Sequence, residues 1–127
     1  MAEETAPLTE RLAALRSDYI HALPGRMLAI ESAWRRLSDV AWDPTLLADL
    51  HRLVHGLSGS GATFGLEAVS IAARVLEQHL KTAIAAGKPA SDPERVQVSE
   101  ALRQLRQVID AVVSKPLSLL DPPQTGR

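Results

Sequence analysis

Hydrophobic residues recur along the chain at helical spacing, and no long segment alternates hydrophobic with polar residues as a β-strand does. Proline and glycine residues interrupt this pattern at several points. The pattern therefore predicts a protein built from helices alone. We expect these helices over residues 8–22, 24–37, 44–62, 66–86 and 92–114.

Residues with strong preferences for helix ends mark several of these boundaries. Pro24-Gly25 is expected to break or kink the first helical stretch. Asp43 is predicted to cap the N-terminus of the third helix, with Pro44 in its first turn. Gly87 suits the C-terminal cap of the fourth helix, and Ser91-Asp92-Pro93-Glu94 suits a capping box at the start of the fifth.

Each predicted helix has one apolar face, which we expect to pack into a shared core. Short connections between helices favour antiparallel neighbours. The predicted fold is all-α, an antiparallel four-helix bundle with an additional or broken N-terminal helix. Residues 1–115 would form the bundle, and the proline-rich residues 116–127 a flexible tail or linker. The expected core positions are Leu8, Leu12, Leu15, Tyr19, Met27, Ile30, Trp34, Leu37, Leu46, Leu47, Leu50, Leu53, Val54, Leu57, Leu66, Val69, Ala73, Leu76, Leu80, Ile84, Val98, Leu102, Leu105, Ile109 and Val112.

The composition excludes several classes of protein. The 127 residues carry a net charge of −1, so no basic field favours nucleic-acid binding. The absence of cysteine excludes disulfides and zinc-thiolate sites. The acidic N-terminus is unlike a signal peptide, and no apolar run is long enough to cross a membrane. We expect a cytoplasmic monomer that binds neither nucleic acid nor membranes.

The most informative residue is His55, which lies about 140° from the apolar stripe of its predicted helix and should face solvent. Gly56, Gly59 and Gly61 follow it, although each glycine inside a helix costs about 1 kcal/mol relative to alanine. Gly59 and Ala62 continue nearly the same line along the helix. We interpret this stretch as a surface cleared of side chains, on which another macromolecule can reach the imidazole.

The spacing His-x-Leu-x-Gly-x-x-x-x-x-Gly, with His55, Leu57, Gly59 and Gly65, resembles the signature of histidine-containing phosphotransfer (HPt) domains. Leu76-Glu77 also fits the pattern of that family. The stretch from Gly61 to Gly65 is especially similar to the N-terminal phosphotransfer domain of chemotaxis histidine kinases. At motif level the resemblance covers roughly residues 46–80.

The resemblance implies that His55 is a phosphoacceptor, which exchanges a phosphoryl group with an aspartate of a response-regulator receiver domain or receives it from a histidine kinase, hybrid kinases included. It implies a carrier rather than an enzyme, with no cofactor of its own, because the receiver supplies Mg²⁺. It also implies that Glu77 orients the imidazole. Gly56, Gly59 and Ala62 would form the docking surface.

The chain departs from the family pattern at Ser58, where members usually have lysine. A lysine would place a positive charge beside the phosphoryl oxygens, whereas serine offers only a hydrogen bond. Arg52 and Arg74 could supply the missing charge, and His51 is expected to be a surface neighbour that tunes the electrostatics of His55.

Three other interpretations stay open. The chain could be a degenerate bundle that binds and inhibits a receiver or kinase without accepting phosphate. It could be the N-terminal phosphotransfer module of a chemotaxis-type kinase. His51 and His55 are also one helical turn apart and could bind a metal or haem, but no carboxylate joins them in an HExxH motif, so we expect no metal site.

Overall fold

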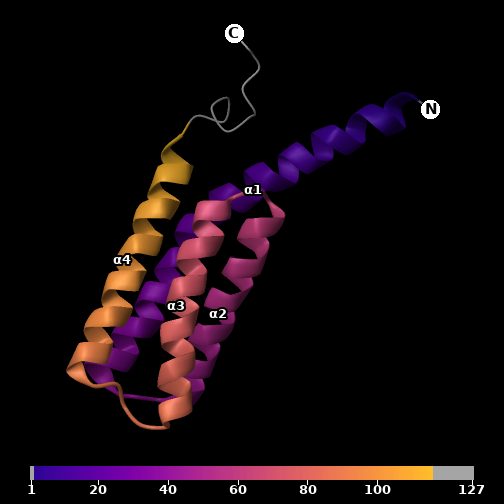
Figure 1. Ribbon diagram of the computed structural model, residues 1–127. Coiled ribbons are helices and arrows are strands. Elements are labelled where there is room, and N and C mark those ends of the chain that lie inside the picture. Colours follow the sequence, from indigo (N-terminus) through magenta and orange to yellow (C-terminus); the bar gives the residue numbers. More distant parts are fainter. Residues whose placement is uncertain (1, 116–127) are drawn as a thin grey trace.

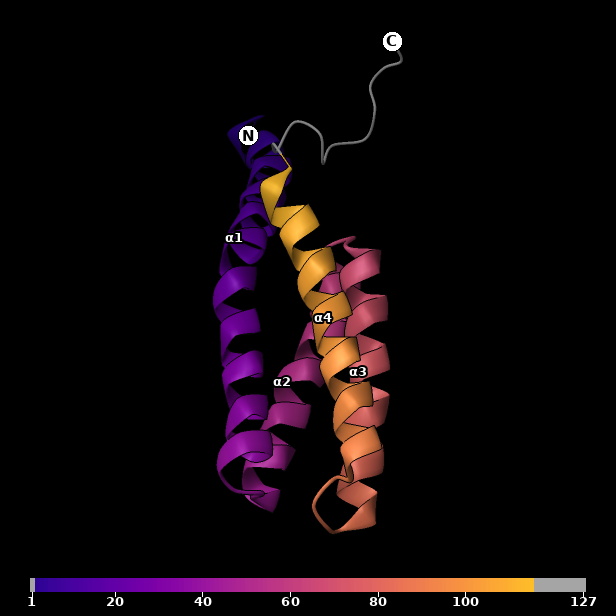
Figure 2. The same ribbon diagram turned by 90° about the vertical axis from the view of Figure 1, so that its left-hand side faces the viewer.

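Four helices pack side by side in an antiparallel bundle (Figures 1 and 2). The computed structural model describes residues 2–115, with side chains from Pro7 onward, so the predicted tail over residues 116–127 lies outside the described residues. Helices α1 and α3 lie at opposite corners, each flanked by α2 and α4 (Figure 2). The predicted all-α four-helix bundle is confirmed. Its elements are α1 (Ala2–Arg35), the short π-helix η1 (Arg36–Val40), α2 (Pro44–Thr63), α3 (Glu67–Ala86) and α4 (Asp92–Ser114).

Helix α1 runs without interruption through Pro24, so the expected division into two helices at Pro24-Gly25 is wrong. Proline removes one backbone hydrogen bond from a helix interior. Leu23, Met27 and Ile30 lie on one face across this point and are almost completely buried. Their burial holds both sides of the proline against the same core, which offsets the lost hydrogen bond.

The first turns of α1 project beyond the end of the other helices (Figure 1). Leu8, Leu12 and Leu15 were expected in the core, but they are 53%, 58% and 53% exposed. Tyr19 is the first residue of this stripe that is buried. The stripe has helical spacing along its whole length, but only its C-terminal end lies beside the bundle.

The predicted helix ends are confirmed at three places. The side chain of Asp43 accepts hydrogen bonds from the backbone N–H groups of the first turn of α2. Ser91 and Glu94 form a reciprocal capping box at the start of α4. Gly87 ends α3 in the left-handed conformation, with φ of +67°.

The core contains most of the predicted residues, with Leu53 and Ile84 as further exceptions. Both are exposed. Leu53 lies outside the buried stripe of α2, which is centred on Leu50 and Val54. On α3, Ala83 is buried and the next residue, Ile84, is left at the surface. None of the described helices has a stretch long and apolar enough to pass through a bilayer.

Candidate functional site

His55 stands on the outer face of α2, with 70% of its side chain exposed. Val54 and Leu57, its neighbours on the opposite side of the helix, are completely buried and fix this part of α2 to the core. The imidazole is therefore presented to solvent from a rigid helix, as its angular position predicts.

Glu77 lies on α3 directly beside this imidazole. Its Oε2 atom is 2.6 Å from Nδ1 of His55, and only 6% of its side chain is exposed. An ionised carboxylate can only accept hydrogen bonds. Nδ1 of His55 therefore donates the hydrogen, which leaves the lone pair on Nε2, the ring nitrogen that can attack an electrophile.

His51 completes a group of three titratable residues. Its Nε2 atom lies 3.4 Å from the same Oε2 atom of Glu77, within ion-pair distance but without the alignment of a hydrogen bond. The rings of His51 and His55 are nearly parallel, with centroids 6.1 Å apart. His51 was expected at the surface, but 22% of its side chain is exposed and its Nε2 atom is buried.

The glycines after His55 have two different environments. A Cβ atom added at Gly56 or Gly59 would meet no atom within 4 Å, and Ala62 is exposed, so this side of α2 is an open surface. A Cβ atom at Gly61 would lie 3.2 Å from the backbone nitrogen of Ser70. The interpretation of Gly61 as clearing the surface is wrong, because this glycine permits close packing of α2 on α3.

Hydroxyl groups brace the glycine-rich half of α2. Ser60 donates to the carbonyl of Gly56 over 2.8 Å, and Thr63 donates to the carbonyl of Gly59 over 3.2 Å. The hydroxyl of Tyr19 on α1 lies 2.7 Å from that of Ser60. These contacts add side-chain hydrogen bonds to a stretch that glycine would otherwise loosen.

Gly65 has a conformational role in the turn from α2 to α3. It adopts a φ of +76°, a backbone conformation that residues other than glycine rarely adopt, and its N–H donates to the carbonyl of Ala62. The final glycine of the sequence motif therefore has a structural explanation that is separate from the chemistry of His55.

The candidate cations differ in how they are held. Arg52 pairs with Asp49 on its own helix. Arg74 of α3 donates from Nη2 to the hydroxyl of Ser70 over 3.0 Å, and that hydroxyl donates to the carbonyl of Ser58 over 2.7 Å. Ser58 itself is 8% exposed and packs between the helices. The structure thus connects Arg74 to α2 through Ser70, whereas Arg52 is engaged elsewhere.

Ser70 is the contact residue that sequence reasoning missed. It lies seven residues before Glu77 and therefore two turns away on the same face of α3. That spacing, once Glu77 is oriented toward α2, would have placed Ser70 at the same helix interface.

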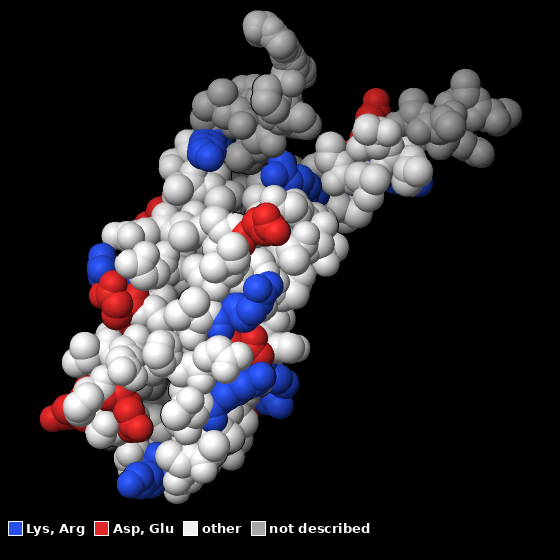
Figure 3. All heavy atoms as spheres, viewed as in Figure 1, with Lys and Arg blue, Asp and Glu red and all other residues white. Residues whose placement is uncertain are grey.

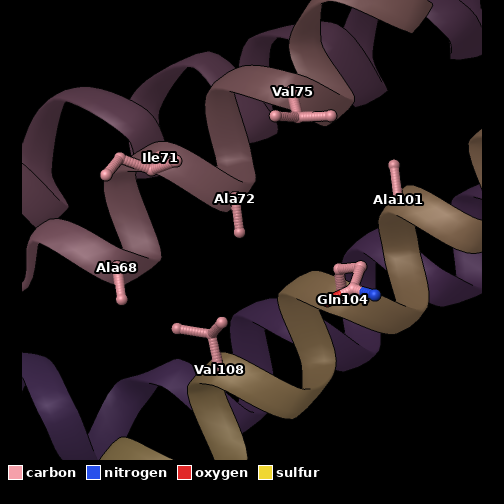
Figure 4. Close-up of a pocket in the computed structure, with 7 residues that line it drawn as sticks. All are labelled: Ala68, Ile71, Ala72, Val75, Ala101, Gln104 and Val108. Atoms are coloured by element: carbon pink, nitrogen blue, oxygen red, sulfur yellow. The ribbon is translucent and has the colours of Figure 1, made fainter.

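An apolar groove between α3 and α4, lined among others by Ile71, Val75 and Val108, has Gln104 as its polar lining residue (Figure 4). Basic and acidic side chains alternate over the face in Figure 3 without a large field of one sign. Among the described residues, no group of three or more histidine, aspartate or glutamate side chains is arranged to hold a metal ion.

No curated protein and no solved structure matches the sequence at a significant level. The family model described as Hpt domain matches residues 14–115, which includes the C-terminal part of α1, all of α2 and α3, and α4. Hpt domains are phosphocarrier modules of two-component systems, which interact with response regulators or kinases. Because this family model covers most of the chain, the chain belongs to the Hpt domain family.

Proposed function

We propose that His55 accepts a phosphoryl group from an aspartyl phosphate of a receiver domain and returns it to such an aspartate. The observation that carries the proposal is the pair formed by the exposed His55 and the buried Glu77, with Nδ1 and Oε2 2.6 Å apart. This pair supports a nucleophilic Nε2 atom that faces solvent, where a partner can reach it.

In the proposed step, the lone pair of Nε2 of His55 attacks phosphorus. The bond between phosphorus and the carboxylate oxygen of the receiver's aspartate breaks, and the aspartate leaves as a carboxylate. Nδ1 keeps its proton, so positive charge develops on the ring, and the carboxylate of Glu77 stabilises that charge. The reverse reaction passes the group to a receiver aspartate and restores the neutral imidazole.

The receiver would supply Mg²⁺ and the aspartate pocket, while this chain supplies a nucleophile on a rigid helix. Phosphoryl transfer depends chiefly on positioning and on neutralising the charge of the phosphoryl oxygens. We propose that the receiver docks on Gly56, Gly59 and Ala62, since these positions leave the side of α2 after His55 free of bulk. The chain would act as a monomeric carrier without catalytic groups for other chemistry.

Arg74 is the cation that we propose for the phosphoryl oxygens. Its guanidinium group is held by Ser70, which in turn bonds the backbone of Ser58. Ser58 occupies the position on α2 where the family usually has lysine. The positive charge beside the phosphoryl oxygens would therefore come from Arg74 on α3. Arg52 is a weaker candidate because Asp49 already pairs with it.

Labelling with a phosphorylated receiver domain tests the proposal. The chain should acquire an acid-labile, base-stable label, and His55→Gln should abolish it. His21→Gln, which changes an exposed histidine on α1, is the matched control and should leave labelling intact. A label that persists in His55→Gln would remove His55 from the mechanism. Receiver binding without any label would favour the degenerate, inhibitory bundle.

A further inference from the structure

The Nε2 atom of His51 is a buried polar atom for which the proposed transfer has no use. It makes no hydrogen bond, although buried polar groups rarely lack one. The nearest acid is Glu77, whose Oε2 atom lies 3.4 Å away and is already held by His55 at 2.6 Å. One buried carboxylate oxygen thus lies between two imidazoles, bonded to one and close to the other.

The two imidazoles differ in their freedom to move. The side chain of His55 is 70% exposed, whereas that of His51 is 22% exposed. Exposed side chains change rotamer readily, on the picosecond to nanosecond timescale. When the ring of His55 turns away, Glu77, whose side chain is 6% exposed in this structure, loses its hydrogen-bond donor. A buried carboxylate without a partner is strongly unfavourable.

A small movement of the carboxylate would satisfy both buried groups. Hydrogen bonds between nitrogen and oxygen have lengths of about 2.7–3.2 Å, so the 3.4 Å separation from His51 needs to shorten only slightly. Within the described part of the chain, no other acid lies within ion-pair distance of His51. Arg74 and Lys81 are one turn to either side of Glu77 on α3, and Arg74 is bound to Ser70.

We propose that His51 is a positioning residue, which donates a hydrogen bond to the Glu77 carboxylate whenever His55 turns away from it. The inference deepens the proposed function and rests on it for its consequence in phosphoryl transfer. Glu77 serves His55 in the transfer step, and His51 holds the carboxylate while His55 turns to meet or leave a partner. The exchange itself requires no phosphate.

A double-mutant cycle on the unphosphorylated full chain tests the exchange. His51→Leu and His55→Leu should each lower stability slightly, because Glu77 keeps one imidazole. The double variant should lower the folding equilibrium constant about tenfold more than the product of the two single effects. The same cycle in a Glu77→Gln background should be additive, because no buried charge is left unpaired. Additive effects with Glu77 present would overturn the proposal.

A spectroscopic measurement on a single variant gives an independent test that does not require the double variant to fold. In His55→Leu, the Nε2 proton of His51 should appear in ¹H–¹⁵N spectra and exchange with water more slowly than in the unchanged protein. His21→Leu is the control and should have no effect on it. If the proton exchanges equally fast with and without His55, the carboxylate does not pass to His51. Either failure would leave the labelling of His55 intact, so the two proposals fail separately.

Discussion

Nδ1 of His55 and Oε2 of Glu77 lie 2.6 Å apart across the interface between α2 and α3, joining an exposed imidazole to a buried carboxylate. The contact brings together residues separated by 22 positions in the sequence. It fixes which ring nitrogen faces solvent, and it places a negative charge beside the ring where positive charge develops during phosphoryl transfer.

Replacing this carboxylate should slow transfer without unfolding the bundle. Glu77→Gln keeps the shape of the side chain but removes its charge, so it should reduce the rate of His55 phosphorylation about 10- to 100-fold, the range for a hydrogen bond to a charged group. Rates of label transfer from a phosphorylated receiver measure the effect. Glu10→Gln, on the exposed surface of α1, is the control. An unchanged rate in Glu77→Gln would show that the pair has no part in transfer.

The two glycine environments on α2 predict opposite effects on stability. Gly59→Ala should raise the free energy of unfolding by about 1 kcal/mol, because alanine favours the helix and its Cβ atom meets open space. Gly61→Ala should lower it, because the new Cβ atom would press on the backbone of α3 at Ser70. Urea denaturation measures both. Equal effects would contradict the different packing of the two positions.

A bulky residue at Gly59 should separate docking from chemistry. Gly59→Leu should reduce transfer from a receiver domain by about tenfold or more, since even modest misplacement of reacting groups is costly. It should leave phosphorylation by phosphoramidate, a small donor that needs no docking surface, nearly unchanged. Ala29→Leu places a leucine on the exposed face of α1 and should affect neither reaction. If Gly59→Leu lost both reactions, the substitution would have disturbed His55 itself, and blocked docking would not explain the result.

Arg74 and Arg52 should contribute unequally. Arg74→Gln should slow transfer several-fold, about the effect of losing one partly exposed charge contact. Arg52→Gln should have less effect, because Asp49 already compensates its charge. Stopped-flow or rapid-quench rates with the same receiver compare the two variants. If Arg52→Gln slowed transfer more than Arg74→Gln, the positive charge that contacts the phosphoryl group would come from α2.

The sequence predicts the helix ends well, because their signals are local. Asp43 and Ser91 act through hydrogen bonds to backbone groups a few residues away, and Gly87 through its own φ angle. The predicted division at Pro24 is wrong because the cost of a proline is local, whereas the burial of Leu23 and Met27 on either side of it depends on the other helices.

The candidate site was only partly predictable, because its contacts cross between helices. The exposure of His55 follows from its angle on one helix, but the burial of Glu77 depends on how α3 is rotated against α2. The spacing of His51 and His55 predicts that the two rings are neighbours, but it does not predict that Nε2 of His51 is buried beside the same carboxylate. The apolar spacing of Leu12 likewise cannot reveal that none of the other described helices reaches the projecting turns of α1 (Figure 1).

The most direct test of the account is to locate phosphorus on the imidazole ring of the phosphorylated chain by long-range ¹H–¹⁵N and ³¹P NMR. Phosphorus should couple to Nε2 of His55, with a proton on Nδ1 held by Glu77. Phosphorus on Nδ1, or on any residue other than His55, would contradict the account.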